Sequence, residues 1–147
     1  MIPLRPEVEE MNRLYKAMEE TYHAAAVAAG LSDSGFLILY ALAELGDGCS
    51  QQEIARHYYA SKQTLHSSIT GLEKKGYLTM APGPGRDRKI LLTPAGRQAL
   101  EEKLTPVFRR ENQVIEELDP EEIQTLLALT RKYVAIHRQM LGEGGGT

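Results

Sequence analysis

Several features are scarce in this sequence of 147 residues, and each absence excludes a class of protein. Its one cysteine, Cys49, rules out a framework of disulfides within the chain. No stretch approaches the ~18 consecutive apolar residues that a membrane-spanning helix needs. Residues 1–13 lack the basic start and apolar run of a signal peptide. We therefore expect a cytoplasmic protein that does not associate with a membrane.

Groups of residues that carry out chemistry are also missing. No nucleophile–base set or phosphate-cradling loop occurs, and the four histidines show neither i,i+4 pairing nor a companion cysteine cluster. The paired glutamates, such as Glu9 and Glu10, are neighbours in sequence. On a helix, neighbours point about 100° apart, so such pairs form solvated faces rather than acid–base dyads. We expect no enzyme activity, no metal site and no cofactor.

Acidic residues outnumber basic ones overall, but the basic residues are concentrated in one segment. The chain has a net charge of −3, yet residues 50–93 alone carry +4, whereas residues 1–49 carry −5 and residues 94–147 carry −2. A cationic segment in an acidic chain favours a polyanionic partner such as nucleic acid.

The pattern of apolar residues predicts helices at both ends of one domain, residues 1–147. Residues 7–29 have heptad spacing, which predicts packing along another helix. This seam comprises Val8, Met11, Tyr15, Met18, Tyr22, Ala25 and Ala29. A second helix is predicted over 33–45, with Phe36, Leu37, Tyr40, Leu42 and Leu45 mostly inward.

Two closely spaced helix starts follow. Ser50 and Glu53 fit a capping box, in which each side chain bonds the other residue's backbone N–H. Ser61 is the predicted cap of the next helix, which extends to Lys75 and ends at Gly76. The buried stripe of this helix consists of Leu65, Ile69 and Leu72.

A β-hairpin and two further helices complete the predicted chain. Tyr77–Ala81 and Lys89–Leu92 are predicted strands, and 82–85 a turn. Thr93 should cap a helix that extends to about Leu118, with a kink or break at Pro106. Asp119 should begin the last helix. The predicted inward face of that helix consists of Ile123, Leu126, Leu127, Thr130, Val134, His137 and Leu141.

The order helix–turn–helix–hairpin predicts a mainly α fold with a small β-hairpin wing, and duplex DNA as the partner. One helix would enter the major groove while the hairpin approaches the neighbouring backbone. We call residues 33–93 the reader region, and the hairpin within it the wing. Residues 7–29 and 94–141 are the predicted dimerisation helices, and 142–147 a flexible tail. These helices carry more apolar surface than the reader region of one chain can bury, so we expect a homodimer.

The predicted DNA contacts lie on the second reader helix and the wing. The outward helix face has no acid before Glu73 and is rich in short hydrogen-bonding side chains, which suits a phosphate-lined groove. Asp87 should hold one of the wing arginines in position, although these charges could alternatively serve solubility alone. The predicted DNA-binding residues are Ser61, Lys62, Gln63, Thr64, His66, Ser67, Arg86, Arg88 and Lys89. The alternative, a winged-helix module that binds protein and not DNA, stays open.

The chain resembles the MarR family of winged helix-turn-helix regulators. The resemblance rests on QEIA from Gln52, SKQTL from Ser61, LEKKGYL from Leu72, RDRK from Arg86 and LTPAG from Leu92. It implies a dimeric, repressor-type DNA binder. Two departures concern DNA contact: Ser67 and Ser68 stand where members often carry an arginine, and the second wing strand is short. Which of Arg86 and Arg88 reaches the groove therefore stays open.

The resemblance also implies regulation by a ligand or by oxidation. Many members lose DNA affinity when a small, often aromatic, molecule binds between the reader and the dimer helices. The candidate effector pocket contains Tyr15, Tyr22 and Tyr40, with packing as the alternative role of these tyrosines. Cys49 precedes a helix N-terminus, so a redox role is permitted, although a buried inert thiol is the usual case.

Overall fold

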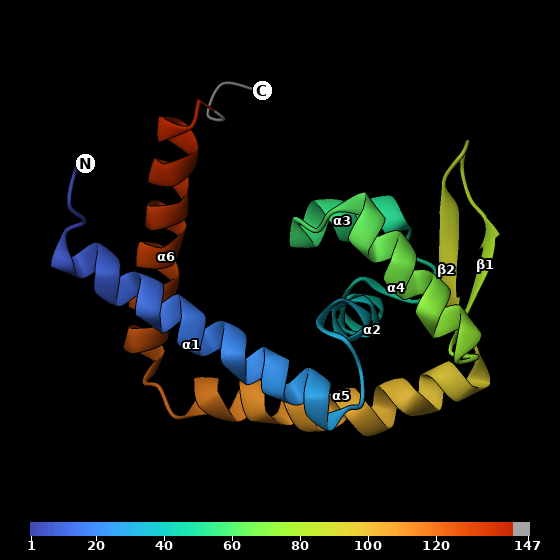
Figure 1. Cartoon of the computed structure of the whole chain (residues 1–147). Helices are drawn as coiled ribbons and strands as arrows, with labels where there is room; N and C mark the ends of the chain where they lie inside the picture. The colour runs from blue at the N-terminus through green and yellow to red at the C-terminus, as the bar shows by residue number, and fades with distance from the viewer. Residues whose placement is uncertain (143–147) are drawn as a thin grey trace. The chain divides into compact units, whose positions relative to one another are not determined.

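The structure is a computed structural model that describes residues 1–142, in which six helices and one antiparallel hairpin follow one another (Figure 1). The predicted fold class is confirmed. The predicted tail, 142–147, lies outside the described residues apart from Gly142. The elements are α1 (Pro6–Ala28), α2 (Asp33–Leu45), α3 (Gln51–Tyr58), α4 (Lys62–Lys74), β1 (Leu78–Pro82), β2 (Arg88–Leu92), α5 (Pro94–Glu116) and α6 (Pro120–Met140).

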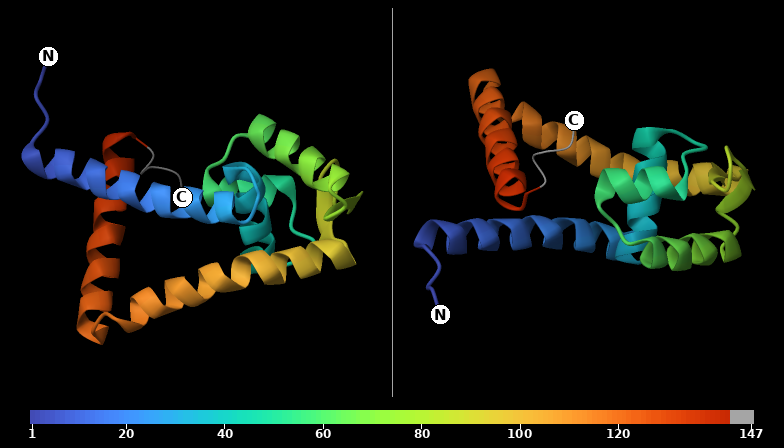
Figure 2. Two further views of the ribbon diagram at one scale, coloured as in Figure 1. Left: turned by 60° about the horizontal axis from the view of Figure 1, so that its bottom comes forward. Right: turned by 90° about the horizontal axis from the view of Figure 1, so that it is seen from above.

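The chain divides into two compact units, Met1–Val107 and Phe108–Thr147. The core of the first unit is built around α2, which lies against α1 and α4 (Figures 1 and 2). Ile38, Leu39 and Ala41 are completely buried in it. A helix that is apolar on all sides is typical of a core position, which explains why burial extends beyond the one predicted face. Of that face, Leu37 and Tyr40 are only half-buried and Leu45 is exposed.

The two reader helices begin where the sequence predicts. Ser50 Oγ accepts from the Glu53 backbone N–H at 3.1 Å, and Glu53 Oε2 accepts from the Ser50 N–H at 2.6 Å, which completes the capping box. Ser61 caps α4, whose buried side chains are Leu65, Ile69 and Leu72. The predicted stripe is therefore confirmed, and it fixes which face of α4 points away from the core.

The wing pairs in simple antiparallel register, with Leu78 opposite Leu92 and Pro82 opposite Arg88. The prediction that Pro82 belongs to the turn is wrong. As the last residue of β1 it can end the strand, where its missing N–H does not interrupt the ladder. Ile90 of β2 also exchanges backbone bonds with the segment before α3, donating to Cys49 O and accepting from Gly48 N, both at 2.9 Å. This second pairing fixes the middle of β2 to the segment before α3.

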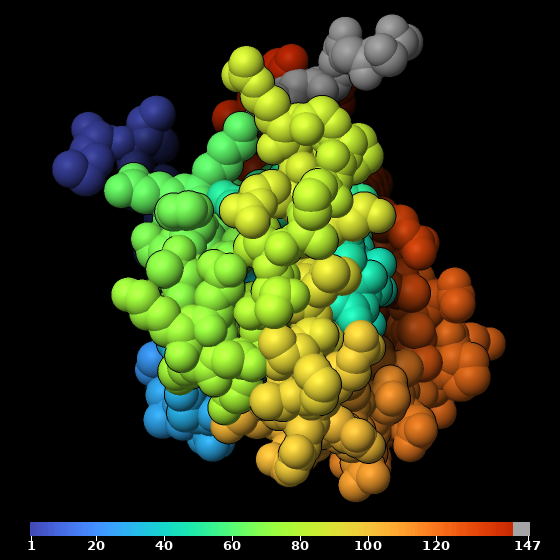
Figure 3. Space-filling view, turned by 90° about the vertical axis from the view of Figure 1, so that its right-hand side faces the viewer, coloured from blue at the N-terminus to red at the C-terminus, as the bar shows by residue number. Residues whose placement is uncertain are grey.

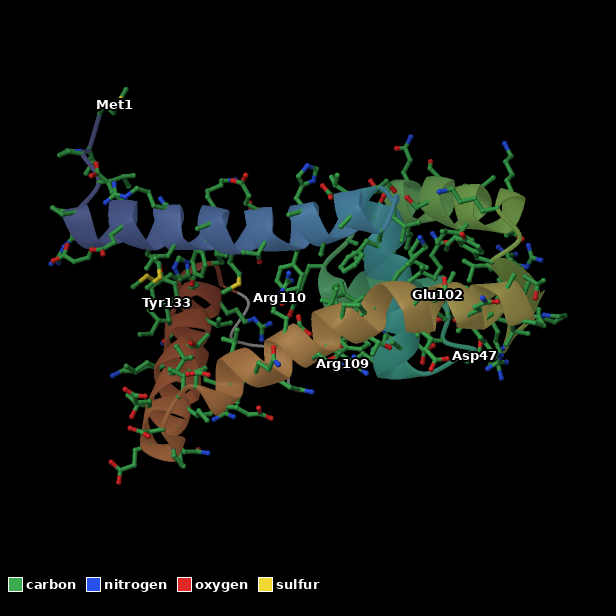
Figure 4. All side chains as sticks on the ribbon, turned by 90° about the horizontal axis from the view of Figure 1, so that it is seen from below. Met1, Asp47, Glu102, Arg109, Arg110 and Tyr133 are labelled. Atoms are coloured by element: carbon green, nitrogen blue, oxygen red, sulfur yellow. The ribbon has the colours of Figure 1, made fainter. Side chains whose placement is uncertain are left out.

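The start of α5 is anchored to the end of the wing. Thr93 Oγ1 donates to Gly76 O at 2.6 Å and accepts from the Gly96 N–H at 3.0 Å, so Thr93 is the predicted cap. A Cβ at Gly96 would lie 1.9 Å from Tyr77 O, so only glycine fits this approach. Asp47 lies beside the first turns of α5 (Figure 4), where Arg97 Nη2 is 2.7 Å from its carboxylate.

Pro106 does not break α5, which is continuous from Pro94 to Glu116. Of the predicted kink or break, the break is wrong, because a proline removes one backbone hydrogen bond, at a cost of about 3 kcal/mol, and the many remaining bonds of a 23-residue helix maintain it. The boundary between the two compact units nevertheless falls just after it, at Val107.

The second unit contains the end of α5, including Arg109 and Arg110, and α6, which includes Tyr133 (Figure 4). Asp119 N donates to Glu122 Oε2 at 2.9 Å in a second capping box, as the sequence predicts for the start of this helix. No residue of α6 is buried in this single chain, so the predicted inward face is uncovered here.

The apolar seam of α1 is uncovered in part, whereas Ala29 at its end is buried. Tyr15 is 46% exposed and Met18 59% exposed, while Val8, Met11 and Ala25 are half-buried. Among the described residues, no single helix is long and apolar enough to cross a membrane. Only α1 and α2 taken together meet that criterion, and they are bent by 91° at the break between them.

Candidate nucleic-acid interface

The outward face of α4 carries the predicted groove-facing residues. Because Leu65, Ile69 and Leu72 point inward, the opposite face is exposed. The space-filling view shows α4 in green beside the wing in yellow-green (Figure 3). The side chains predicted to contact DNA from this helix are all exposed: Ser61, Lys62, Gln63, Thr64, His66 and Ser67.

Two of these side chains already form the helix cap. Ser61 Oγ accepts from the Thr64 N–H at 3.2 Å and donates to Thr64 Oγ1 at 2.7 Å. Thr64 keeps its own hydroxyl proton, which it can donate to a phosphate or a base edge. Gln51 Nε2 donates to Lys62 O at 2.9 Å, which ties the start of α3 to the start of α4.

Gln63, His66 and Ser67 are the more available groups. Within residues 1–142, none of these three side chains makes a hydrogen bond to the protein. The structure separates Ser67 from Ser68, the two residues at the position of the family's arginine. Ser68 is half-buried and its hydroxyl lies 2.5 Å from Ser34 Oγ on α2, so it faces the core and not the exposed face.

The wing presents three exposed cations, Arg86, Arg88 and Lys89, and none of them forms an ion pair within the part of the chain that is described. Asp87 does contact one of the wing arginines, as predicted, but through the Arg88 backbone and not through a guanidinium group. Its carboxylate accepts from the backbone N–H of Arg88 at 3.1 Å, and its own N–H donates to Pro84 O. Asp87 therefore shapes the turn and leaves both guanidinium groups available.

A groove of about 380 Å³ joins α4 to the wing. Lys62 and His66 line it from α4, and Arg86 and Arg88 line it from the wing. The structure thus brings these four predicted residues together. Ser61, Gln63, Thr64 and Ser67 are outside the groove lining. Lys89 instead lines a separate cleft between the segment before α3 and the turn of the wing.

Gln51 and Gln52, in the first turn of α3, also line the groove and were not among the predicted contacts. Backbone and side-chain N–H groups at a helix start favour phosphate. The capping box at Ser50 marks this helix start in the sequence, but not its position beside the wing.

Cys49 is buried, and its surroundings oppose thiolate formation. Burial, followed by the nearby carboxylates of Glu53 and Asp47, raises the pKa of the Cys49 thiol to about 11. The helix start after Ser50 does not offset these effects. The thiol is therefore protonated near neutral pH and poorly suited to oxidation.

An aromatic cavity of about 1010 Å³ lies on the first unit, lined from α1, α2 and α3. Tyr22 and Tyr40 of the candidate effector pocket line it, with ring centroids 6.5 Å apart in an edge-to-face arrangement. Tyr15 is outside the lining. Tyr58 meets Tyr40 edge-to-face at 6.4 Å, and its hydroxyl donates to Glu44. Burial and this hydrogen bond raise the pKa of Tyr58.

No group of three or more His, Cys, Asp or Glu in the described residues is arranged to hold a metal ion.

Comparison with known proteins supports the family suggested by the sequence. Residues 29–88 match the model of the MarR family, which confirms that resemblance. No curated protein sequence matches the chain.

Solved structures extend the similarity to the fold. A MarR family regulator from Neisseria meningitidis has a TM-score of 0.81 at 17% identity, over 95% of this chain and 99% of that one. MepR of S. aureus, solved in complex with DNA, has a TM-score of 0.69 at 19% identity, over 90% and 97%. NadR, solved with 4-hydroxyphenylacetate, has a TM-score of 0.70 at 21% identity, over 90% and 95%. At such identities the similarity establishes the fold alone.

Proposed function

We propose, from the premise that residues 29–88 are the winged helix-turn-helix region of a MarR-family protein, that this chain is a transcriptional regulator that binds duplex DNA. The groove between α4 and the wing carries the proposal. It brings Lys62 and His66 together with Arg86 and Arg88, on the one segment of the chain with a net positive charge. Its three cations, Lys62, Arg86 and Arg88, outnumber its two acids, Glu73 and Asp87, and can neutralise phosphates and release counterions.

The proposed contacts divide into two kinds. Gln63 is exposed on α4 and can pair bidentately with adenine, so it should read sequence. Arg88 belongs to the wing, where contact with phosphate or a narrow minor groove adds affinity for any duplex. MepR, which has the same fold, was solved on DNA, and this supports the assignment of this surface.

We further propose a homodimer. The exposed apolar side chains of α6 include Leu126, Leu129 and Val134, and those of α1 include Leu14 and Met18. Apolar residues at helical spacing that are uncovered in one chain are typical of an interface. A two-fold axis would present two copies of α4 to half-sites about one DNA turn, roughly 34 Å, apart.

Such a dimer would act as a repressor by occupying a pseudo-palindromic operator. A small ligand in the Tyr22–Tyr40 cavity would release this dimer from DNA. The cavity is lined by Tyr58 at the end of α3, a helix of the reader region, so a bound ligand would contact the DNA-binding part of the chain. NadR, of the same fold, was solved with a small aromatic acid.

The test is selection of bound sequences from random duplex DNA, followed by mobility-shift titration at two salt concentrations. Affinity for the selected duplex should fall steeply with salt. Gln63→Ala should change the selected sequences, whereas Arg88→Ala should weaken binding to all duplexes by roughly tenfold without changing the preference. Arg131→Ala, which removes an exposed arginine from α6, is the charge-matched control. Absence of binding at low salt, or identical selection profiles for the two test variants, would contradict the proposal.

A further inference from the structure

The aromatic cavity on the first unit has an acidic lining. Four carboxylates line it from α1 and α2, against a single lysine. Its charged residues, apart from two histidines, are Lys16, Glu19, Glu20, Asp33 and Glu44. The aromatic part of the lining consists of Tyr22, Phe36, Tyr40 and Tyr58.

The basic groups of the lining are already paired with acids of the same lining. Lys16 Nζ lies 3.2 Å from Glu19 Oε2, and His23 Nδ1 lies 2.8 Å from Asp33 Oδ1. His57 Nε2 is 3.9 Å from a Glu44 oxygen. No basic side chain of the lining is therefore left over to receive a carboxylate ligand, and the acids outnumber the one lysine.

The aromatic rings form a connected set next to one of these acids. Tyr40 contacts Tyr22, Phe36 and Tyr58, with ring centroids 6.3 to 6.5 Å apart. The last ring of the set, Tyr58, donates its hydroxyl to Glu44. Aromatic faces attract organic cations, and a carboxylate beside them adds attraction of the same sign.

We infer that this cavity binds an organic cation with an aromatic or apolar body, such as an arylalkylamine, and discriminates against aromatic acids. The inference deepens the effector site of the proposed function and rests on it. The rings would cover the apolar body, as is usual for small-ligand sites, while the carboxylates of the lining would select the positive charge. A carboxylic acid of similar shape would contact the same rings, but the carboxylates of the lining would repel its negative charge.

Three phenols that share one ring and differ at the end of the side chain separate charge from shape. Tyramine ends in an ammonium group, tyrosol in a neutral alcohol and 4-hydroxyphenylacetate in a carboxylate. We expect isothermal titration calorimetry with the full chain at neutral pH to show that tyramine binds roughly tenfold or more tightly than 4-hydroxyphenylacetate, with tyrosol between them. Equal or tighter binding of the acid, or binding of none of the three, would overturn the inference.

A matched pair of variants on α1 tests the role of the lining acids. Glu20→Gln removes a lining carboxylate, and Glu10→Gln removes an exposed carboxylate of the same helix that is outside the lining. Glu20→Gln should weaken tyramine binding about threefold to tenfold and leave tyrosol binding unchanged, because only a charged ligand responds to the field. Glu10→Gln should change neither. If both variants had the same affinity for tyramine as the unchanged chain, the lining would not select charge.

Tyr40→Leu tests the rings separately. This change should weaken tyramine and tyrosol alike, because it removes the central ring from both complexes. Unchanged affinity for both probes would place the ligand elsewhere and overturn the inference. DNA binding is measured on the same preparations without any probe, so failure of the ligand inference is distinguishable from failure of the proposed function.

Discussion

Apolar side chains are covered in the reader region and uncovered in the terminal helices. Ile54, Leu65 and Ile90, from α3, α4 and β2, have no exposed surface. In α6, by contrast, Leu126 is 51% exposed and Leu129 60% exposed, and no residue of that helix is buried. One chain therefore buries the apolar residues of the reader region but leaves those of α6 exposed, which supports the proposed dimer.

Charge divides the chain at a different place from burial. Residues 50–93, which contain α3, α4 and the wing, carry the net positive charge, whereas α2 and the terminal helices belong to acidic segments. Acidic ends repel a phosphate backbone, so they favour approach of DNA to the groove between α4 and the wing. The uncovered apolar surface of the ends is thus better suited to protein than to DNA.

The largest expected effect comes from placing a charge on the uncovered surface of α6. Leu129→Asp should convert the proposed dimer into a monomer, because burying an unpaired carboxylate in an apolar interface costs several kcal/mol. Loss of the second half-site contact should then weaken binding to a palindromic duplex by about a hundredfold or more. Light scattering and mobility-shift titration measure the two quantities.

Gln124→Asp is the matched control, since it adds the same charge at an exposed polar position of α6. It should leave both the oligomeric state and the DNA affinity unchanged. If Leu129→Asp behaved like this control, the apolar surface of α6 would be exposed to water in solution. The exposed apolar residues of α6 would then not indicate an interface.

The next effect compares one chemical change in the two regions. Leu39→Ala, in the buried helix α2, should lower the free energy of unfolding by about 2–5 kcal/mol through lost burial and a residual cavity. Leu126→Ala should alter stability mainly at protein concentrations where the dimer forms, because its side chain is half uncovered in one chain. Urea denaturation at two protein concentrations checks both expectations, and equal losses in dilute protein would contradict them.

Much of the reader region could be predicted because its signals are local. A capping box needs only Ser50 and Glu53, and the stripe of α4 needs only Leu65, Ile69 and Leu72. The complete burial of Ile38 and Leu39 could not be predicted from one apolar face, because it depends on elements that pack from several sides. The continuity of α5 through Pro106 likewise reflects the whole helix and not one residue.

The candidate interface was harder to predict, because long-range pairing positions it. The backbone bonds between Ile90 and Cys49 fix the wing near the start of α3, and no local pattern reveals them. For this reason Gln51 and Gln52 were missed as groove residues. The inward turn of Ser68 toward Ser34 also depends on tertiary packing, whereas the exposure of Gln63 follows from helical periodicity alone.

The covered state of the reader region also predicts a dependence on pH. The Cys49 thiol has a pKa of about 11 in the fold, against about 8.5 in an unfolded chain. Between these values the unfolded chain has released a proton that the fold retains, so stability contributed by the protonated thiol is lost as pH rises through this window. Relative to Cys49→Ala, the unchanged protein should lose on the order of 1–2 kcal/mol between pH 8 and pH 10.

Urea denaturation of both proteins at pH 8, 9 and 10 measures that difference, and the other titrating groups cancel in the comparison. Iodoacetamide should modify the folded protein slowly at pH 8, since little thiolate is present. A constant difference across this range, together with rapid modification, would indicate that Cys49 is more accessible than its 7% exposure implies.

The smallest expected effect uses a motif that occurs in both regions. Ser50 and Glu53 form a capping box at a residue that is 5% exposed, whereas Asp119 and Glu122 form one on the exposed start of α6. Ser50→Ala leaves the Glu53 N–H without its partner where water has little access, and should cost about 1–2 kcal/mol of unfolding free energy. Asp119→Ala should cost roughly 0.5 kcal/mol, because the bond from the Asp119 backbone N–H to Glu122 survives the change and this helix start is exposed to water. Equal costs in urea denaturation would show that the two caps are equally accessible to water. The two regions would then differ only in the burial of their apolar side chains.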